Sequence, residues 1–177
     1  MMRRKFLCAV VLVLAVCSVS WAAQRQDARV KNIVSLFTRV NPKLSAKTAD
    51  SYAHIILEAA QKYRIDPYVI AALIVHESTV NAHAVSRGGD YGLMQVRWKV
   101  HAKEIQREHR VKSSKGLMKP RVNIFFGTRI LSECYAKAGT IEGAIRLYSG
   151  GNRQLVAKVT RTMRELGRTQ DRHDRRR

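Results

Sequence analysis

The chain has 177 residues, with 33 lysines and arginines against 13 aspartates and glutamates, and its formal net charge is +20 at pH 7. This length suits one compact domain with a sizeable core and excludes two domains of ordinary size. So large an excess of cations indicates a polyanionic neighbour, such as nucleic acid, wall polymer or a membrane surface, although solubility alone explains any single lysine or arginine.

The N-terminus has the order of segments found in a secretory signal peptide. Three cations at residues 3–5 precede an apolar run over residues 6–19, and small residues follow that run. The run is about 14 residues long, short of the roughly 18 expected of a membrane-spanning helix. We therefore expect residues 1–22 to be a signal peptide and the mature chain to reach the periplasm or cell envelope. An uncleaved N-terminal anchor remains the alternative.

The cysteines allow no disulfide within the mature chain. Cys8 and Cys17 lie in the expected signal peptide, which leaves Cys134 alone. The four residues that end at Cys17 faintly resemble a lipoprotein cleavage site, although Val16 is larger than the residue usually found there. Lipidation of Cys17 therefore stays an alternative.

Apolar residues recur at helical spacing through most of the remaining chain. The spacing predicts a first helix over residues 24–40 and a second over residues 45–63. A third helix should run from Pro67 to about Val80, with Asp66 as its N-cap and proline in its first turn. This third segment is apolar on every side, which predicts a buried central helix.

The later part of the chain has a weaker pattern. A loop over residues 81–91 precedes a short segment that starts at Gly92, and residues 97–119 are basic and weakly patterned. We expect three further helices, over residues 120–138, 141–148 and 153–166. No long alternation of apolar and polar residues occurs, so one all-α or nearly all-α domain is predicted over residues 23–168. The arginine-rich residues 169–177 predict a disordered tail.

Glu77 is an anomalous residue on the apolar third helix. It follows Ile70 by seven residues and Leu73 by four, so its carboxyl should lie on the core-facing side near the helix end. Burial and the negative end of the helix dipole both disfavour its ionised form, which should raise its pKa. A carboxylic acid that is protonated near neutral pH is what cleavage of a glycosidic bond requires. A buried glutamate satisfied by an arginine or a hydroxyl is the alternative.

Three groups of residues, in this order, resemble the motifs of one enzyme family. They are Glu77-Ser78 with Gly92-Leu93-Met94-Gln95; Pro120, Asn123-Ile124, Gly127 and Leu131; and Tyr148-Ser149-Gly150-Gly151. Together they make residues 67–151 similar to the goose-lysozyme-like catalytic domain of the soluble lytic transglycosylases. The resemblance implies a lysozyme-like fold. It also implies cleavage of the bond between N-acetylmuramic acid (MurNAc) and N-acetylglucosamine (GlcNAc) in peptidoglycan, with formation of 1,6-anhydro-MurNAc ends.

The same resemblance assigns roles to residues and implies no cofactor and no metal. Glu77 would be the sole catalytic acid and base, and the substrate-binding residues would be Ser86, Leu93, Met94, Gln95 and Tyr148. Each binding residue also has an ordinary structural reading: Leu93 and Met94 as core, Ser86 as a turn cap, and Tyr148 as packing with its hydroxyl at the surface. Ser149 stands where the family usually has asparagine, which puts that amide's hydrogen bond in doubt.

Two alternatives to the lytic transglycosylase remain open. Asp90 is the only nearby acid that could act as a second carboxylate, which would make the chain a hydrolysing muramidase. A non-catalytic factor that binds the wall, or assembles with a secretion or conjugation machine, would keep the fold and use its basic faces. We expect the chain to be a monomer that binds peptidoglycan and does not bind nucleic acid. After cleavage of the signal peptide we expect no membrane span.

Other enzyme classes lack their motifs. His76-Glu77 begins like the zinc motif His-Glu-x-x-His, but position 80 is valine, so we predict no metal site. A serine-hydrolase elbow of the form Gly-x-Ser-x-Gly does not occur.

Overall fold

The computed structural model describes residues 24–175, so the expected signal peptide and the motif around Cys17 lie outside the described residues. The helices are the first one, residues 24–40, followed by α2 (Ala46–Tyr63), α3 (Pro67–Ser78), α4 (Trp98–His109), the 3-10 helix η1 (Ser114–Met118), α5 (Pro120–Ala138), α6 (Ile141–Tyr148) and α7 (Arg153–Arg175). Two short strands, β1 (Asp90–Tyr91) and β2 (Val96–Arg97), pair antiparallel. The predicted all-α class is therefore confirmed.

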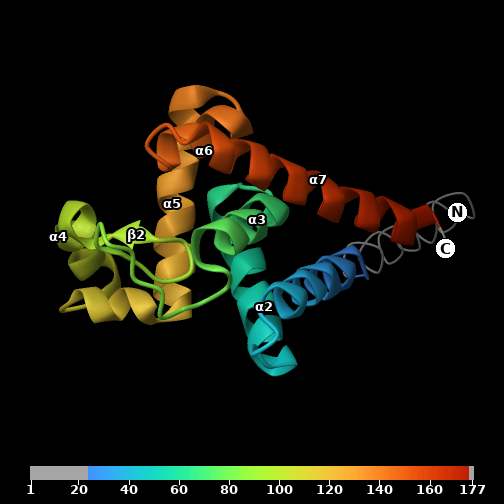
Figure 1. Ribbon diagram of the computed structural model, residues 1–177, viewed down its shortest axis with the longest axis horizontal. Coiled ribbons are helices and arrows are strands. Elements are labelled where there is room, and N and C mark those ends of the chain that lie inside the picture. The colour runs from blue at the N-terminus through green and yellow to red at the C-terminus, as the bar shows by residue number, and fades with distance from the viewer. Residues whose placement is uncertain (1–23, 176–177) are drawn as a thin grey trace, which may run out of the picture.

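Helix α3 lies at the centre of the helical assembly, where it packs against α2 and α7 (Figure 1). Every residue from Pro67 to Val75 is buried, as the apolar run predicted. The Asp66 carboxylate accepts a hydrogen bond of 2.7 Å from the backbone N–H of Tyr68, and Pro67 occupies the first turn. Burial of the whole helix leaves only its C-terminal end, which carries Glu77, near the surface.

The predicted disordered tail is wrong as far as Arg175, because α7 continues as a helix to that residue. A buried polar network explains the extension. The Tyr68 hydroxyl donates a hydrogen bond of 2.9 Å to the side-chain carbonyl of Gln170, and the Asn32 amide donates to the Tyr68 hydroxyl at 2.9 Å. These bonds join the first helix, α3 and α7. In Figure 1 the first helix and α7 both extend from the centre toward the same end of the molecule. Sequence periodicity could not show this contact.

The weakly patterned stretch of residues 97–119 also forms helix, as α4 and η1. Its pattern is weak because α4 buries only one residue, Ile105, and exposes the rest in whole or in part. Over residues 24–175, no helix combines the length and the apolar character that crossing a membrane would need.

Replacing Gln170 with alanine should lower the free energy of unfolding by about 1–3 kcal/mol, because two buried donors lose their acceptor. Urea denaturation followed by circular dichroism measures the change. Thr169→Ala is the control, since that exposed hydroxyl donates only to the Glu165 carbonyl and its loss should cost under about 0.5 kcal/mol. A disordered tail would instead leave the denaturation midpoint unchanged in both variants.

Candidate active site

A cleft of about 570 Å³ opens beside the C-terminal end of α3. Its walls come from α3, the β1–β2 hairpin, the start of α4, and α5, α6 and α7. The polar side chains that line it include Glu77, Ser86, Asp90, Gln95, Arg97, His101 and Tyr148, and the apolar ones are Val96, Ile130, Leu147 and Leu155. The cleft therefore gathers residues separated by more than seventy positions in the sequence around one carboxyl group.

Glu77 is half-buried in this cleft, and its pKa is raised to about 7. The largest cause is desolvation by the surrounding protein, and the negative charge of Asp90 adds to it. Within the described residues, no arginine or hydroxyl satisfies the carboxyl. The side chain of the preceding residue, His76, turns away and forms a hydrogen bond of 2.9 Å with the Thr162 hydroxyl. Near neutral pH, Glu77 thus has substantial populations of both its protonated and its ionised form, as its position on α3 predicted.

Asp90 is ionised and held in place by the hairpin. Arg97, its register partner across the strands, donates to both carboxylate oxygens at 2.6 and 2.9 Å. The Ser86 hydroxyl donates to one of these oxygens at 2.8 Å, and the backbone N–H of Asp90 donates back to that hydroxyl at 3.0 Å. The hydrogen bonds from Arg97 hold the pKa of Asp90 below its usual value. Asp90 is therefore a fixed negative charge beside Glu77.

Ser86 and Gln95 both line the cleft, where the sequence predicted substrate-binding residues. The Ser86 hydroxyl is bonded to Asp90, so the capping role and the position at the cleft coexist. Gln95 has a positive φ of 49°, and its amide donates to the carbonyls of Gly92 at 2.9 Å and Ala84 at 3.3 Å. These bonds fix the turn that carries both residues into the cleft wall.

Leu93 and Met94 are placed differently from the prediction, because both side chains are fully buried and do not line the cleft. Met94 acts through its backbone. Its N–H donates to the Asn123 side-chain carbonyl at 2.7 Å, and its own carbonyl accepts from the Tyr148 hydroxyl at 2.7 Å. The interpretation of both residues as core is therefore the correct one.

Tyr148 does line the cleft, but its hydroxyl is not at the surface. That hydroxyl is bonded to Met94, and the ring lies close enough to Glu77 that the carboxyl's charge, after burial itself, raises the pKa of the phenol. Ser149, at the position where asparagine is usual in the family, donates to the Arg146 carbonyl at 3.3 Å and also lines the cleft. The tyrosine therefore links the hairpin to α6 across the cleft.

Asn123 and Gly127 on α5 hold the hairpin in place, a role that sequence reasoning missed. The fully buried Asn123 amide donates to the carbonyls of Tyr91 and Leu117 at 2.7 and 2.9 Å, besides accepting from Met94. A Cβ at Gly127 would lie 2.7 Å from the sulfur of Met94, so only glycine allows this approach. An asparagine within an apolar helix face was the available signal.

Sequence reasoning also missed two residues that line the cleft, the arginine Arg97 and the histidine His101. Both belong to the basic stretch with weak periodicity, in which no residue could be assigned to a face. Over the described residues, no group of three histidine, cysteine or acidic side chains is arranged to hold a metal ion.

Removing the charge of Asp90 should lower the pKa of Glu77. Removing Arg97, the partner of Asp90, should raise the pKa of Glu77. In Asp90→Asn the nearby negative charge is lost. In Arg97→Gln that charge remains but is no longer offset by the guanidinium. NMR titration of the Glu77 side-chain carboxyl measures both shifts. Shifts in the same direction in the two variants would contradict the electrostatic coupling.

Glu77→Gln should stabilise the fold at high pH. Because the folded-state pKa of about 7 lies above the ordinary value of 4.5, the folded protein binds the proton more tightly. Glu77 therefore costs stability as the pH rises from about 4.5 to 7, and the cost persists above that range. We expect Glu77→Gln to exceed the wild type by about 1–3 kcal/mol at pH 8 and to match it near pH 4. Urea denaturation at the two pH values tests this, and a difference independent of pH would contradict it.

Comparison with known proteins identifies a family whose model matches this chain. The family model described as the transglycosylase SLT domain matches residues 54–170, a range that includes α3, the hairpin, α5, α6 and most of α7. Membrane-bound lytic murein transglycosylase C of Shigella sonnei (strain Ss046) is 31% identical over 112 residues. That match covers 62% of this chain but only 31% of the relative, so the chain corresponds to about a third of the relative's length.

Proposed function

The chain belongs to the transglycosylase SLT domain family, and we propose that it is a lytic transglycosylase, which cleaves the MurNAc–GlcNAc bond of peptidoglycan and leaves 1,6-anhydro-MurNAc ends. The observation that carries the proposal is Glu77. It is a desolvated carboxyl with a pKa of about 7, and it lies in a cleft that holds one other carboxylate, Asp90. A group with this pKa can both give and accept a proton near neutral pH.

Glu77 would act first as an acid and then as a base. In its protonated form it gives its proton to the glycosidic oxygen as the bond to the MurNAc anomeric carbon breaks. The N-acetyl group of the same sugar stabilises that carbon. The sugar's 6-hydroxyl then attacks the anomeric carbon and passes its proton to the Glu77 carboxylate. The cycle restores the protonated glutamate and consumes no water.

The hydrolysing alternative is less well supported, because a muramidase needs a second carboxylate that attacks the sugar or activates water. Asp90 is the candidate, yet both of its oxygens accept hydrogen bonds, from Arg97 and from Ser86. Its low pKa also makes it a weak base. In this proposal Asp90 acts only as a fixed charge that adds to desolvation in raising the pKa of Glu77.

The glycan strand would lie in the cleft against Ser86, Gln95 and Tyr148. The Tyr148 hydroxyl is already bonded to Met94, so the tyrosine would offer its ring rather than a free donor to a sugar. Leu93 and Met94 would support this wall from the core instead of touching the substrate.

The chain would be exported and would act as a monomer in the cell envelope. The relative is named as a membrane-bound murein transglycosylase, and the N-terminal sequence has the order of a signal peptide. Action beside a secretion or conjugation machine would use the same chemistry.

Mass spectrometry of the muropeptides released from purified peptidoglycan tests the activity. We expect the mature chain to release products one water lighter than hydrolysis products, and Glu77→Gln to release fewer by about 1,000-fold or more. Asp90→Asn is the matched control: it should still give anhydro products, with its pH optimum moved to lower pH. Hydrated products that vanish in Asp90→Asn would instead make the chain a muramidase, and no products from folded protein would favour a binding factor.

A further inference from the structure

Helix α4 separates its charges onto two faces. Lys99, Lys103, Arg107 and Arg110 follow one another by four, four and three residues, so they share one side of the helix and its C-cap, and all four are exposed. The two acids of the helix, Glu104 and Glu108, lie on the side that faces α5. The outward face of α4 is therefore cationic without interspersed acids.

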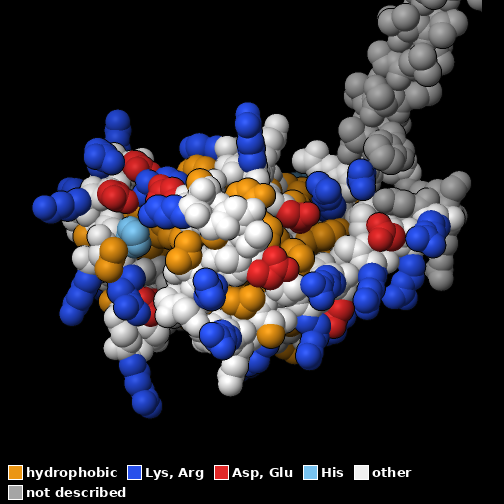
Figure 2. All heavy atoms as spheres, turned by 90° about the horizontal axis from the view of Figure 1, so that it is seen from above, with side chains coloured by type: hydrophobic (Ala, Val, Ile, Leu, Met, Phe, Trp, Pro, Cys, Tyr) orange, Lys and Arg blue, Asp and Glu red, His pale blue; other side chains and the backbone are white. Residues whose placement is uncertain are grey.

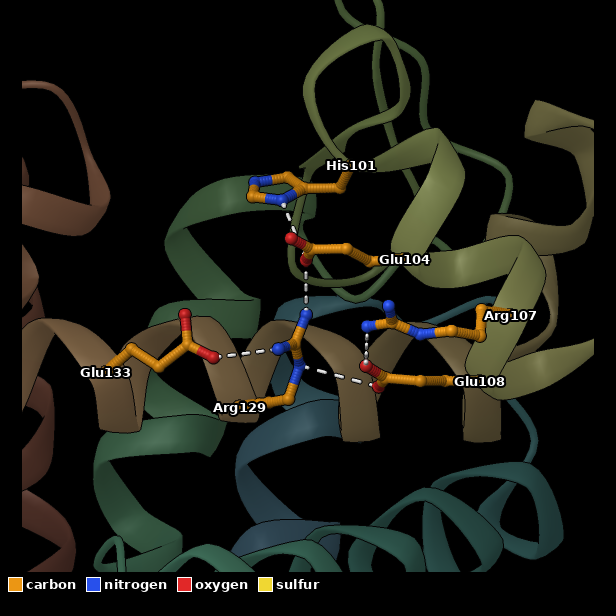
Figure 3. Close-up of polar contacts among 6 residues, drawn as sticks. All are labelled: His101, Glu104, Arg107, Glu108, Arg129 and Glu133. Atoms are coloured by element: carbon orange, nitrogen blue, oxygen red, sulfur yellow. Dashed lines mark hydrogen bonds and ion pairs between the residues drawn. The ribbon is translucent and has the colours of Figure 1, made fainter.

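Arg129 on α5 binds both of those acids (Figure 3). Its guanidinium donates to Glu104 at 2.6 Å and forms an ion pair of 3.5 Å with Glu108. It also donates to Glu133 on its own helix at 2.8 Å and lies over the Phe126 ring, 4.5 Å from the centroid. Glu104 and Glu108 thus point toward Arg129 on α5 rather than toward the lysines on the outer face of α4.

The chain after α4 continues the cationic surface. Lys112, Lys115 and Lys119 flank or belong to η1, which packs against α4, and all three are exposed. Between Arg97 and Ser132 the sequence contains no acid other than the two that Arg129 binds. We call the following set the cationic lobe: Lys99, Lys103, Arg107, Arg110, Lys112, Lys115 and Lys119. Among the described ion pairs, only that of Arg107 with Glu108, at 3.8 Å, involves a member of the lobe.

The cationic lobe begins where the cleft ends. Arg97, the residue before α4, and His101 in its first turns both line the cleft, so the lobe extends one cleft wall outward. Helix α4 and η1 occupy the end of the molecule opposite the far end of α7 (Figure 1), and lysine and arginine side chains project from that end (Figure 2). A polymer that leaves the cleft along this wall meets the lobe first.

We propose that the cationic lobe binds the free carboxylates of the peptide stems on a peptidoglycan strand whose sugars occupy the cleft. The proposal rests on the proposed function, since it names the part of the same substrate that lies outside the cleft. Long, exposed lysines without a shaped pocket suit many weak contacts with carboxylates spaced along a strand, rather than one tight site. Such contacts keep the strand at the cleft and are weakened by salt.

Binding to purified sacculi, measured by sedimentation, tests the proposal without any cleavage. All proteins carry Glu77→Gln, so the strands stay intact, and failure of the catalytic proposal leaves this measurement valid. The test variant replaces Lys99, Lys103, Lys112 and Lys115 with glutamine. The matched control makes the same change of charge with Arg161, Arg164, Arg168 and Arg172, four exposed arginines on α7.

We expect the lobe variant to bind intact sacculi about tenfold more weakly at low salt, as the loss of four exposed ion pairs would give. The α7 control should lose less than about twofold, and the difference should shrink at high salt. Sacculi whose free carboxylates have been converted to neutral amides should bind the unsubstituted lobe as weakly as the lobe variant binds intact sacculi. Circular dichroism melting checks that both variants fold.

Three results would overturn the proposal. Equal losses in the two variants would mean that total charge, not the lobe, governs binding. Unchanged binding to sacculi with amidated carboxylates would mean that carboxylates are not recognised. Lobe-dependent binding to vesicles of anionic phospholipid that is tighter than binding to sacculi would assign the lobe to a membrane surface instead.

Discussion

Burial of α3 on all sides is the constraint on which the rest of the structure depends. A helix without a solvated face must be covered by other helices, and α2 and α7 supply that cover. The cover ends at the last turn, so Glu77 lies where apolar packing gives way to a cleft. Desolvation there raises the carboxyl's pKa, and the same packing that stabilises the fold therefore leaves a carboxyl that is partly protonated near neutral pH.

Opposite Glu77, the cleft wall is a short hairpin that could not hold its shape alone, since its strands have two residues each. The buried Asn123 forms two hydrogen bonds with this hairpin, at Tyr91 and Met94, and Tyr148 adds a third from α6 through the Met94 carbonyl. Asn123 also donates to the Leu117 carbonyl of η1. Gly127 lets the hairpin approach α5 closely. The motif residues Asn123, Gly127 and Tyr148 thus hold this wall against α5 and α6.

Two arginines set the electrostatics of the molecule in different ways. Arg97 holds Asp90 ionised beside Glu77 and partly offsets its charge, while the negative charge that remains favours the protonated form of Glu77. Arg129 instead binds Glu104 and Glu108, so the acids of α4 do not offset the lysines on its outer face. The Arg97–Asp90 pair affects the pKa of Glu77 within the cleft. The contacts of Arg129 leave a cationic surface on α4 beside the cleft.

The sequence alone determined the helical class, the bounds of α5 and α6, the burial of α3 and the anomaly of Glu77, because each follows from local periodicity and capping. Tertiary contacts decided the rest. Leu93 and Met94 looked like binding residues from their motif, but only the approach of α5 places them in the core. The helical course of α7 beyond Leu166 likewise depends on Gln170 reaching Tyr68, more than a hundred residues away. Periodicity reports which face of a segment is apolar, whereas a buried polar bond between distant segments leaves no periodic signal.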